Sequence, residues 1–313
     1  MYSQATIIAN PRAGAGRVLR LSAEILREAR KWAKAVEFFW TRAEGDGIEL
    51  AKKAVVKGSE LIISLGGDGT VNEVVNGLVV GRRETGRDCV LGIIPVGTSC
   101  ALAKQLGISR GLPAVKLMAK GATKTIDLMR LRWLTRCRDR KERFATTIAH
   151  FGFGGAVARM VGSTLKELGG FLAFAVGATF QLFRYRGEPM LIEVDQKHAA
   201  QPKVFSAIVA NTQWEGGGMR VAPEARPDDG VLDIIVVEDV PLLSRLKSFP
   251  KVYKGTHVGL PFVTSWMGRK VMVKGERVLP FEFDGEWAEC RECFVEVVPA
   301  ALKVLVPQQA AGA

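Results

Sequence analysis

Cysteine is scarce in this chain, and so is histidine, the other common ligand of zinc. The 313 residues include five cysteines and three scattered histidines. An odd and small number of cysteines argues against a disulfide-stapled fold and fits a reducing compartment, so a cytoplasmic protein is expected. The single C-x-x-C pair, Cys290 and Cys293, has no second pair and no histidine partners, so the sequence does not predict a structural zinc site.

Long apolar runs and leader-like segments are missing as well. The longest apolar stretch, residues 169–183, is shorter than the roughly 20 residues that a helix needs to cross a membrane. The chain starts MYSQATIIANP, without the basic segment and cleavage site of a signal peptide, so none is expected. These absences, with an apolar fraction of 48%, predict a globular protein with a buried core.

The sequence has an excess of positive charge. Its 44 Lys and Arg residues against 32 Asp and Glu residues give a formal net charge of +12. Such a surface attracts anions such as nucleic acid, anionic lipid headgroups or phosphorylated ligands, or it serves solubility alone. No basic and aromatic RNA-binding motif accompanies the charge, so no nucleic-acid partner is expected.

The pattern of apolar residues changes near residue 130 and predicts two domains. In residues 1–130, short apolar runs alternate with amphipathic helical segments, which is typical of an α/β domain with a parallel, doubly wound sheet. Residues 131–299 contain a helical stretch at about 156–184, several short β-type runs and one helix-like interruption. This second part predicts a mostly antiparallel β-sandwich domain.

The strongest chemical signal is the segment SLGGDGTVNEVVNGL at 64–78. An apolar strand here runs into a five-residue loop, Gly66, Gly67, Asp68, Gly69 and Thr70, and a helix follows. Glycines let backbone N–H groups approach a ligand, and a helix N-terminus favours an anion, so the loop suits phosphates. The carboxylate of Asp68 suits this loop if a cation lies between it and the phosphates. The alternative is a tight turn with a capping box between Thr70 and Glu73.

Two better-known nucleotide motifs are absent from the sequence. The nearest match to a P-loop, GRRETGR at 81–87, ends in Arg and lacks the Lys and hydroxyl residues of that motif. No G-x-G-x-x-G follows a strand, so the usual dinucleotide fingerprint is missing too.

Several ordered blocks occur over roughly residues 5–307: IIANPRAGAGR at 7–17, GGDGTVNEVVNGL at 66–78, IIPVGT at 93–98, TIDLMR at 125–130, the run at 209–238 and FDGEW at 283–287. Together these blocks resemble the diacylglycerol kinase catalytic-domain family, in particular its soluble bacterial lipid kinases related to sphingosine kinases. The resemblance implies a kinase that uses ATP and Mg²⁺ to phosphorylate a lipid hydroxyl. It also implies an α/β nucleotide domain, a β-sandwich lipid domain, an active site between them, and a final segment, 300–313, that returns to the first domain.

The resemblance further implies which residues bind the nucleotide and the metal. The implied nucleotide-binding residues are Asn10, Thr41, Gly66, Gly67, Asp68, Gly69, Thr70, Glu73 and Thr98. Asp68 and Asp127 match acidic positions that the family uses around Mg²⁺. A second cation is implied at the PDDGVLD turn, bound by Asp229 and the carbonyls of Arg226 and Val231, and a hard cation suits such oxygen ligands.

Two carboxylates in FDGEW are the implied catalytic residues. Asp284 and Glu286 are separated by one glycine, and at a glycine turn two such side chains can converge. Glu286 matches the family's catalytic glutamate, which is proposed to accept the proton of the lipid hydroxyl. The alternative for this segment, and for the turn at 227–233, is an Asp-Gly hairpin at the surface.

One block departs from the family's pattern. After Thr98 the family commonly has a residue followed by Asn and then Asp or an apolar residue, whereas this chain has Cys100 and Ala101. A thiol and a methyl group cannot replace the hydrogen bonds of an amide or the charge of a carboxylate. A catalytically degenerate member that binds lipid or nucleotide is therefore an alternative, unless Lys104, one helical turn further on, reaches a phosphate.

Substrate and partners leave further alternatives open. A kinase of sphingoid bases is an alternative, because the loop residues do not distinguish it from a diacylglycerol kinase. NAD kinases share the GGDG loop, but the Asn-Pro opening and the DGE block favour the lipid kinases. A lipid substrate and a charge of +12 predict peripheral contact with an anionic membrane, and a homodimer stays open. The basic stretch 130–143 is a solvated hairpin tip, a nucleic-acid patch or a contact for anionic lipid. The aromatic side chains of Phe171, Phe174, Phe180 and Phe183 line a lipid path or belong to the core.

Overall fold

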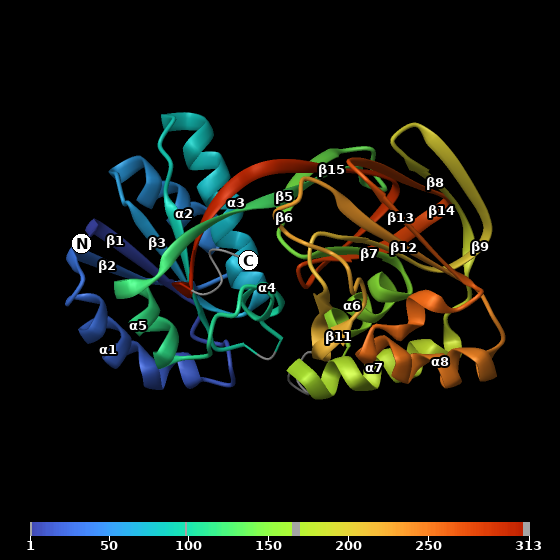
Figure 1. The fold of residues 1–313 in the computed structure, drawn as a ribbon, viewed down its shortest axis with the longest axis horizontal. Helices are drawn as coiled ribbons and strands as arrows, with labels where there is room; N and C mark the ends of the chain where they lie inside the picture. The colour runs from blue at the N-terminus through green and yellow to red at the C-terminus, as the bar shows by residue number, and fades with distance from the viewer. Residues whose placement is uncertain (1, 98, 165–169, 309–313) are drawn as a thin grey trace. The chain divides into compact units, whose positions relative to one another are not determined.

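The chain folds into two compact units. The computed structural model describes residues 2–97, 99–164 and 170–308. Unit 1 comprises Met1–Ile126 and Ala300–Ala313, and unit 2 comprises Asp127–Pro299. Strands and helices alternate in unit 1, whereas strands predominate in unit 2. The predicted order of an α/β part followed by a β-rich part is therefore confirmed (Figure 1).

Unit 1 is built around four parallel strands in the order β4, β3, β1 and β2. The strands are β1 (Tyr2–Ala9), β2 (Ala33–Trp40), β3 (Leu61–Gly66) and β4 (Val90–Pro95). The helices are α1 (Arg17–Ala29), α2 (Asp46–Lys57), α3 (Asp68–Thr85), α4 (Ala101–Gln105) and α5 (Leu112–Lys120). Figure 1 shows α2 and α3 on one side of these strands and α1 and α5 on the other. The end of strand β15 (Glu286–Val306) adds a further parallel pairing, of Lys303 and Val304 with β4.

Small and apolar residues explain why unit 1 packs in this way. All six residues of β3, LIISLG, are buried, as expected for a parallel strand that is covered on both faces. Helices α2 and α3 lie in close contact because Gly77 and Gly81 face α2. A Cβ atom on Gly77 would lie 2.3 Å from the carbonyl oxygen of Ile48, so no larger residue fits there without a shift.

Unit 2 is a mostly antiparallel assembly. Its strands are the end of β5 (Ala122–Leu134), β6 (Arg140–Ala145), β7 (Ile148–Gly152), β8 (Glu188–Val194), β9 (Lys197–Ala210), β10 (Trp214–Glu215), β11 (Met219–Arg220), β12 (Leu232–Glu238), β13 (Val263–Gly268), β14 (Lys270–Phe283) and most of β15. Its helices are α6 (Phe153–Ser163), α7 (Gly170–Arg184) and α8 (Leu242–Lys254). Strands β9 and β14 each pair with β8 along one half and with β7 along the other, so both bend across the unit.

Two apolar cores lie on opposite faces of the strands of unit 2, because alternate residues of a strand point to opposite sides. In β9, Ala207 and Val209 belong to the core that contains Phe151, Phe281 and Phe283. The intervening residues Ile208 and Ala210 belong to the second core, which includes Met219 and Val221. Phe174 of α7 and Phe249 of α8 pack against this second core, so the helices cover that face.

The helical stretch expected at 156–184 is two helices, α6 and α7, and residues 165–169 lie outside the described part of the chain. The helical content expected for this stretch is confirmed in the residues that the structure describes. Among residues 2–97, 99–164 and 170–308, no helix combines the length and the apolarity needed to cross a membrane.

Candidate functional site

The sequence-predicted nucleotide residues of unit 1 gather at one edge of its sheet. The strands β1, β2 and β3 are parallel neighbours, so their carboxyl ends share an edge, which is where open α/β sheets bind ligands. The Thr41 amide donates to the Ala9 carbonyl over 2.9 Å, and the Asn10 amide donates to the Leu65 carbonyl over 3.0 Å. The side-chain amide of Asn10 also donates to Thr70 Oγ1 over 3.4 Å. Residues from three strand ends are thereby held together.

Glycines bring two loops of this edge into backbone contact. The amides of Val96 and Gly97 both donate to the carbonyl of Gly66, over 2.8 and 3.1 Å. A Cβ atom on Gly97 would lie 2.6 Å from the Cα atom of Gly67, and one on Gly66 would lie 2.4 Å from Thr70 Oγ1. Only glycine fits at either position, so the walls of this site are made of main chain.

The start of α3 differs from the predicted capping box. The helix begins at Asp68 with Gly67 as its N-cap, so Thr70 already lies in the first turn. The carboxylate of Glu73 accepts hydrogen bonds from the amides of Gly45 and Gly47, over 2.9 and 2.8 Å. The capping-box interpretation was therefore wrong, and Glu73 holds the loop between β2 and α2. Within the described residues, no side chain caps this helix start, where backbone N–H groups have no acceptor within the helix.

Asp68 links this helix to the loop after β4. Its Oδ1 atom accepts a hydrogen bond from the amide of Ala101 over 2.7 Å, where α4 begins. The predicted nucleotide residue Thr98 lies outside the described residues. Arg110 was not singled out from the sequence, yet its guanidinium donates to the Gly97 carbonyl over 2.7 Å and so supports this loop. A basic residue a short distance beyond a glycine loop is a weak signal that could have found it.

The surroundings of Cys100 indicate a structural role for this residue. Its side chain is buried, and its thiol donates to the Gly97 carbonyl over 3.4 Å. Burial, with a contribution from the charge of Asp68, raises the pKa of the Cys100 thiol to about 11, so the thiol stays neutral near pH 7. The backbone is left-handed, with φ 52° and ψ 53°. Asn adopts this conformation more readily than most residues, which gives a physical reason for the Asn that the family commonly has here.

In unit 2, Asp284 holds the turn between β14 and β15. Its buried carboxylate accepts hydrogen bonds from the Thr146 amide over 2.7 Å, the Thr146 hydroxyl over 2.8 Å, the Thr147 amide over 2.9 Å and the Thr147 hydroxyl. A carboxylate in a buried place needs such donors. The backbone of Asp284 is also left-handed, with φ 48°, so these hydrogen bonds maintain an otherwise disfavoured conformation.

Glu286 starts β15 and lines an open groove of about 430 Å³. The groove is also lined by Trp133, Thr135, Arg136, Lys141, Arg143, Phe283, Trp287, Ala288 and Glu289. Three of these residues are cations from the β5–β6 hairpin, which was expected as a solvated tip, a nucleic-acid patch or a lipid contact. A half-buried carboxylate beside cations can take up a proton from a ligand while the cations offset negative charge.

The turn at 227–231 brings together carboxylates from distant parts of unit 2. Asp127 Oδ2 accepts a hydrogen bond from the Gly230 amide over 2.7 Å, and Asp229 Oδ1 accepts one from the Val231 amide over 3.1 Å. Burial and the charge of Asp127 raise the pKa of Asp229. Burial and the charge of Asp229 raise the pKa of Asp233 to about 6. Asp229 and Asp233 are thus neighbouring carboxylates with raised pKa values. A divalent cation would stabilise their charged forms, so this turn fits such an ion.

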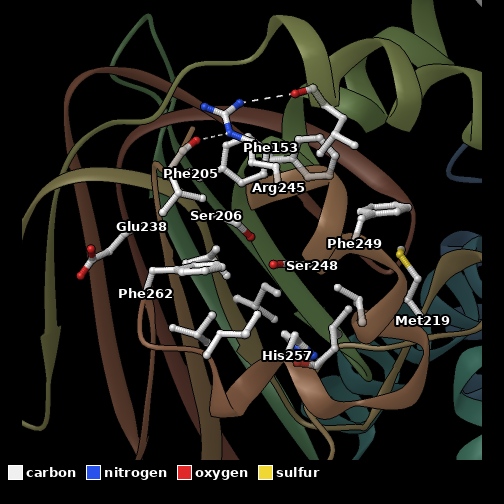
Figure 2. A pocket seen from close by; sticks show the side chains of 18 of the residues that line it. Phe153, Phe205, Ser206, Met219, Glu238, Arg245, Ser248, Phe249, His257 and Phe262 are labelled. Carbon is white, nitrogen blue, oxygen red and sulfur yellow. Dashed lines mark hydrogen bonds between the residues drawn. The ribbon is translucent and has the colours of Figure 1, made fainter. Parts of the chain in front are cut away.

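An apolar cavity of about 90 Å³ lies in unit 2 beside α8 (Figure 2). Its walls are mostly aromatic and aliphatic, with Phe153, Phe205, Phe249 and Phe262 among the residues drawn in Figure 2. Arg245 also lines it, with its guanidinium 4.4 Å from the centre of the Phe205 ring. Such apolar cavities bind apolar groups.

Helix α7 presents a row of apolar side chains to solvent. Leu172, Val176, Phe180 and Phe183 are 40–56% exposed and follow one another at helical spacing. The phenylalanines that were expected to line a lipid path or to belong to the core therefore differ in their surroundings. Phe174 packs against the second core, whereas Phe180 and Phe183 are exposed. The side chain of Phe171 lies outside the described part.

Comparison with known proteins identifies relatives over nearly the whole chain. The family model described as Diacylglycerol kinase catalytic domain matches residues 4–131, and the one described as YegS C-terminal NAD kinase beta sandwich-like domain matches residues 147–306. A diacylglycerol kinase of Mycobacterium tuberculosis is 29% identical over 306 residues, covering 97% of this chain and 95% of the relative. A diacylglycerol kinase of Bacillus subtilis is 29% identical over 287 residues, covering 91% and 90%.

A solved structure shows that the fold is shared as well. A diacylglycerol kinase from Bacillus anthracis aligns with a TM-score of 0.72 at 18% identity, covering 99% of this chain and 98% of that chain. At this identity the likeness concerns the fold alone.

The left-handed backbone of Cys100 predicts which substitutions it tolerates. We expect Cys100→Asn to raise the free energy of unfolding by about 0.5–1 kcal/mol, because Asn is less strained there. Cys100→Val, an apolar residue of similar size, should lower it by about 1–2 kcal/mol, because a β-branched residue is strained at positive φ. Chemical denaturation of the three proteins measures this. The reverse order of Asn and Val would show that the thiol, not the backbone, sets stability here.

The raised pKa of Asp233 predicts that Asp233→Asn stabilises the folded protein by an amount that depends on pH. The folded protein keeps a proton that the unfolded chain releases above about pH 4, so stability falls as the pH rises from about 4 to about 6. We expect Asp233→Asn to stabilise the protein by about 1–3 kcal/mol at pH 8 and to give little gain at pH 4. Denaturation at both pH values measures this, and added Mg²⁺ should reduce the gain at pH 8. An equal gain at both pH values would contradict the electrostatic cause.

Proposed function

The chain belongs to the diacylglycerol kinase catalytic-domain family, with a C-terminal domain of the YegS type, and on that premise we propose that it transfers the γ-phosphoryl group of ATP to a hydroxyl of diacylglycerol or a similar lipid alcohol. The observation that carries this proposal is the glycine-built edge of unit 1. Gly67 and Gly97 are in backbone contact, and the uncapped start of α3 lies beside them. Phosphates bind where backbone N–H groups and a helix N-terminus are accessible, so this edge would bind those of ATP.

Asp68 would hold Mg²⁺ at this edge. Its carboxylate is oriented by the Ala101 amide and lies at the start of the helix, where an anion alone would compete with phosphate. Mg²⁺ prefers carboxylate, phosphate and water oxygens, so the residues present fit the ion. When bound, Mg²⁺ would offset the charge of the transferred phosphoryl group.

Glu286 is assigned the role of base in unit 2. It would accept the proton of the lipid hydroxyl as that oxygen attacks the γ-phosphorus atom, while ADP leaves. Arg136, Lys141 and Arg143 line the same groove and would offset the charge on the phosphoryl oxygens. Asp284 is assigned to positioning, because its carboxylate is occupied by Thr146 and Thr147.

The turn at 226–231 would hold a second cation with a structural role. The raised pKa values of Asp229 and Asp233 support this, because a bound cation would relieve the repulsion among the carboxylates. Asp127 donates its amide hydrogen to the Pro227 carbonyl and accepts from Gly230, so it would support this turn. The ligands would be Asp229 and the carbonyls of Arg226 and Val231.

The lipid would use two features of unit 2. The end of an acyl chain would enter the apolar cavity beside α8, whose walls are mostly aromatic and aliphatic (Figure 2). The exposed row on α7 would rest in the membrane that supplies the lipid. Arg184 and Arg186 follow this row and are exposed, so the surface combines apolar side chains with cations that attract anionic headgroups.

The first prediction from this proposal is catalytic. The protein should transfer label from ATP, with Mg²⁺, to at least one lipid in mixed micelles of diacylglycerol, monoacylglycerol, ceramide or sphingosine. Glu286→Gln should lower kcat by about 10²–10⁴-fold, because a general base is lost, and leave the circular dichroism spectrum unchanged. Asp68→Asn should instead raise the ATP KM.

A matched control is Glu292→Gln. Glu292 lies on the same strand as Glu286, and its carboxylate forms an ion pair with Lys274 at the surface. This variant should keep its turnover. Absence of labelled product with every acceptor would refute the kinase proposal, and a Glu286→Gln variant with near-normal kcat would refute the role of that residue.

The second prediction concerns the membrane. Phe180→Glu combined with Phe183→Glu should weaken binding to anionic vesicles at least about tenfold, because two apolar side chains no longer enter the bilayer and two negative charges are added. The control is Leu19→Glu, which changes a similarly exposed apolar residue of unit 1. Vesicle flotation at low and high salt measures binding. Equal losses in both variants, or equal binding to neutral and anionic vesicles, would contradict α7 as the contact.

A further inference from the structure

Three buried titratable side chains meet in unit 2, apart from the residues assigned to the kinase reaction. They are His150 of β7, Glu215 of β10 and Glu282 of β14, which are 5%, 9% and 7% exposed. One potential ligand atom from each lies within 4.8 Å of the other two. Among the described residues, this is the one group of three or more His, Cys, Asp or Glu side chains that converges so closely.

Hydrogen bonds join these three side chains to one another and to their neighbours. His150 Nδ1 lies 2.8 Å from Glu215 Oε1, and His150 Nε2 lies 2.6 Å from the Ser206 hydroxyl. Glu282 Oε2 accepts a hydrogen bond from the Gly285 amide over 3.1 Å. Burial and the negative charge of Glu215 raise the pKa of Glu282 well above its usual range, so a proton between the two carboxylates keeps them together.

One buried acceptor in the group has no ordinary donor. In the described part of the chain, no amide, hydroxyl or amine donates to Glu215 Oε2, and this atom is inaccessible to solvent. A buried carboxylate oxygen without a donor is costly, so such an atom calls for an explanation. A proton on Glu282 partly satisfies it, and a cation bound by both carboxylates would satisfy it better.

We propose that His150, Glu215 and Glu282 form a binding site for a first-row transition-metal dication, with Zn²⁺ as the leading candidate. The ligands would be His150 Nδ1 and one oxygen of each carboxylate. A neutral imidazole and two carboxylates carry two negative charges, so a dication makes the buried group neutral. The nitrogen ligand favours zinc and its neighbours over Mg²⁺ and Ca²⁺, which prefer oxygen.

The surroundings of His150 fit this role. A carboxylate oxygen can only accept, so in the absence of metal the contact over 2.8 Å places a hydrogen on Nδ1, while Nε2 and the Ser206 hydroxyl share the second hydrogen bond. With metal on Nδ1, the hydrogen moves to Nε2 and donates to Ser206 Oγ, so the same contact over 2.6 Å then orients the ligand. Metal-bound histidines nearly always have such an outer partner for the second ring nitrogen.

The geometry requires only small adjustments. Ligand atoms of a tetrahedral zinc ion lie about 3.4 Å apart for bonds of about 2.1 Å. His150 Nδ1 and Glu215 Oε1 are slightly closer than this, at 2.8 Å, and would separate as the ion entered. His150, Ser206 and Glu215 also line the apolar cavity (Figure 2 labels Ser206), so a fourth coordination position would face it. That position would take water or an oxygen of a bound ligand.

The test measures metal binding directly and does not depend on kinase activity. The full chain is stripped with a chelator, and Zn²⁺ is titrated in competition with a chromophoric chelator of known affinity. We expect one zinc per chain, and Co²⁺ should give the visible absorption of a low-symmetry nitrogen and oxygen site, without the intense thiolate charge-transfer band. Glu215→Gln and Glu282→Gln should each weaken zinc binding at least about 100-fold, and Ser206→Ala about 10–100-fold.

Two controls separate this site from other metal binders in the chain. Cys290→Ser with Cys293→Ser removes the buried pair of thiols, and Asp229→Asn alters the turn proposed for a hard cation. Both should keep the zinc affinity and the Co²⁺ spectrum. Glu282→Gln keeps a hydrogen-bonding group of the same shape, so it serves as the ligand variant if Glu215→Gln does not fold.

The outcomes are decisive in either direction. Weaker zinc binding in the Glu215, Glu282 and Ser206 variants, with the affinity of both controls unchanged, supports the site. No zinc bound by the stripped parent protein, unchanged affinity in both glutamine variants, or loss of binding in the cysteine variant would overturn it.

Discussion

The buried carboxylate of Asp284 accepts hydrogen bonds from the amides and hydroxyls of Thr146 and Thr147, and the β14–β15 turn is organised around it. A buried charge is tolerated only when donors of this kind surround it, so the loop before β7 and this turn depend on each other. Two residues before Asp284 lies Glu282, the proposed zinc ligand, and two residues after it lies Glu286, the proposed base. Glu282 also accepts a hydrogen bond from the Gly285 amide. A change of charge on Glu282 would therefore alter the strength of a hydrogen bond within the turn that carries Glu286. One carboxylate thus sets the positions of two others with different proposed roles.

The two units present chemistry in different ways. In unit 1 the candidate phosphate site is made of main chain, because Gly66 and Gly97 have no room for a side chain. Its proposed specificity would rest on backbone N–H groups and on Asp68. In unit 2 the candidate groups are side chains on strands, including Glu286 and the cations in its groove. A main-chain site suits phosphates, which all nucleotides share, whereas side chains can be varied to suit one lipid.

Charge is distributed unevenly between surface and interior. The chain carries a formal charge of +12, yet unit 2 contains two clusters of carboxylates, and each includes a carboxyl group whose pKa is raised, Asp233 in one and Glu282 in the other. One lies at the 227–233 turn with Asp127, and the other joins Glu215 and Glu282 to His150. Burial raises the pKa values of Asp233 and Glu282, and the charges of neighbouring carboxylates raise them further. A bound cation would offset both effects. Basic side chains at the surface cannot do so, because water and salt screen them.

The sequence by itself determined what depends on neighbouring residues: the strand, glycine loop and helix around Gly66–Thr70, the alternation of strands and helices before residue 130, and the change to β-type runs after it. These follow from periodicity and from the conformational freedom of glycine, which act over a few residues. Tertiary structure decided the partners of the polar side chains. Glu73 accepts from Gly45 and Gly47 and does not cap its own helix, and Asp127 supports a turn about a hundred residues away. The histidines look scattered along the chain and predict no metal site. Only the pairing of β7 with β9 and β14 places His150 beside Ser206 and Glu282, because the register of a sheet joins residues that no local pattern relates.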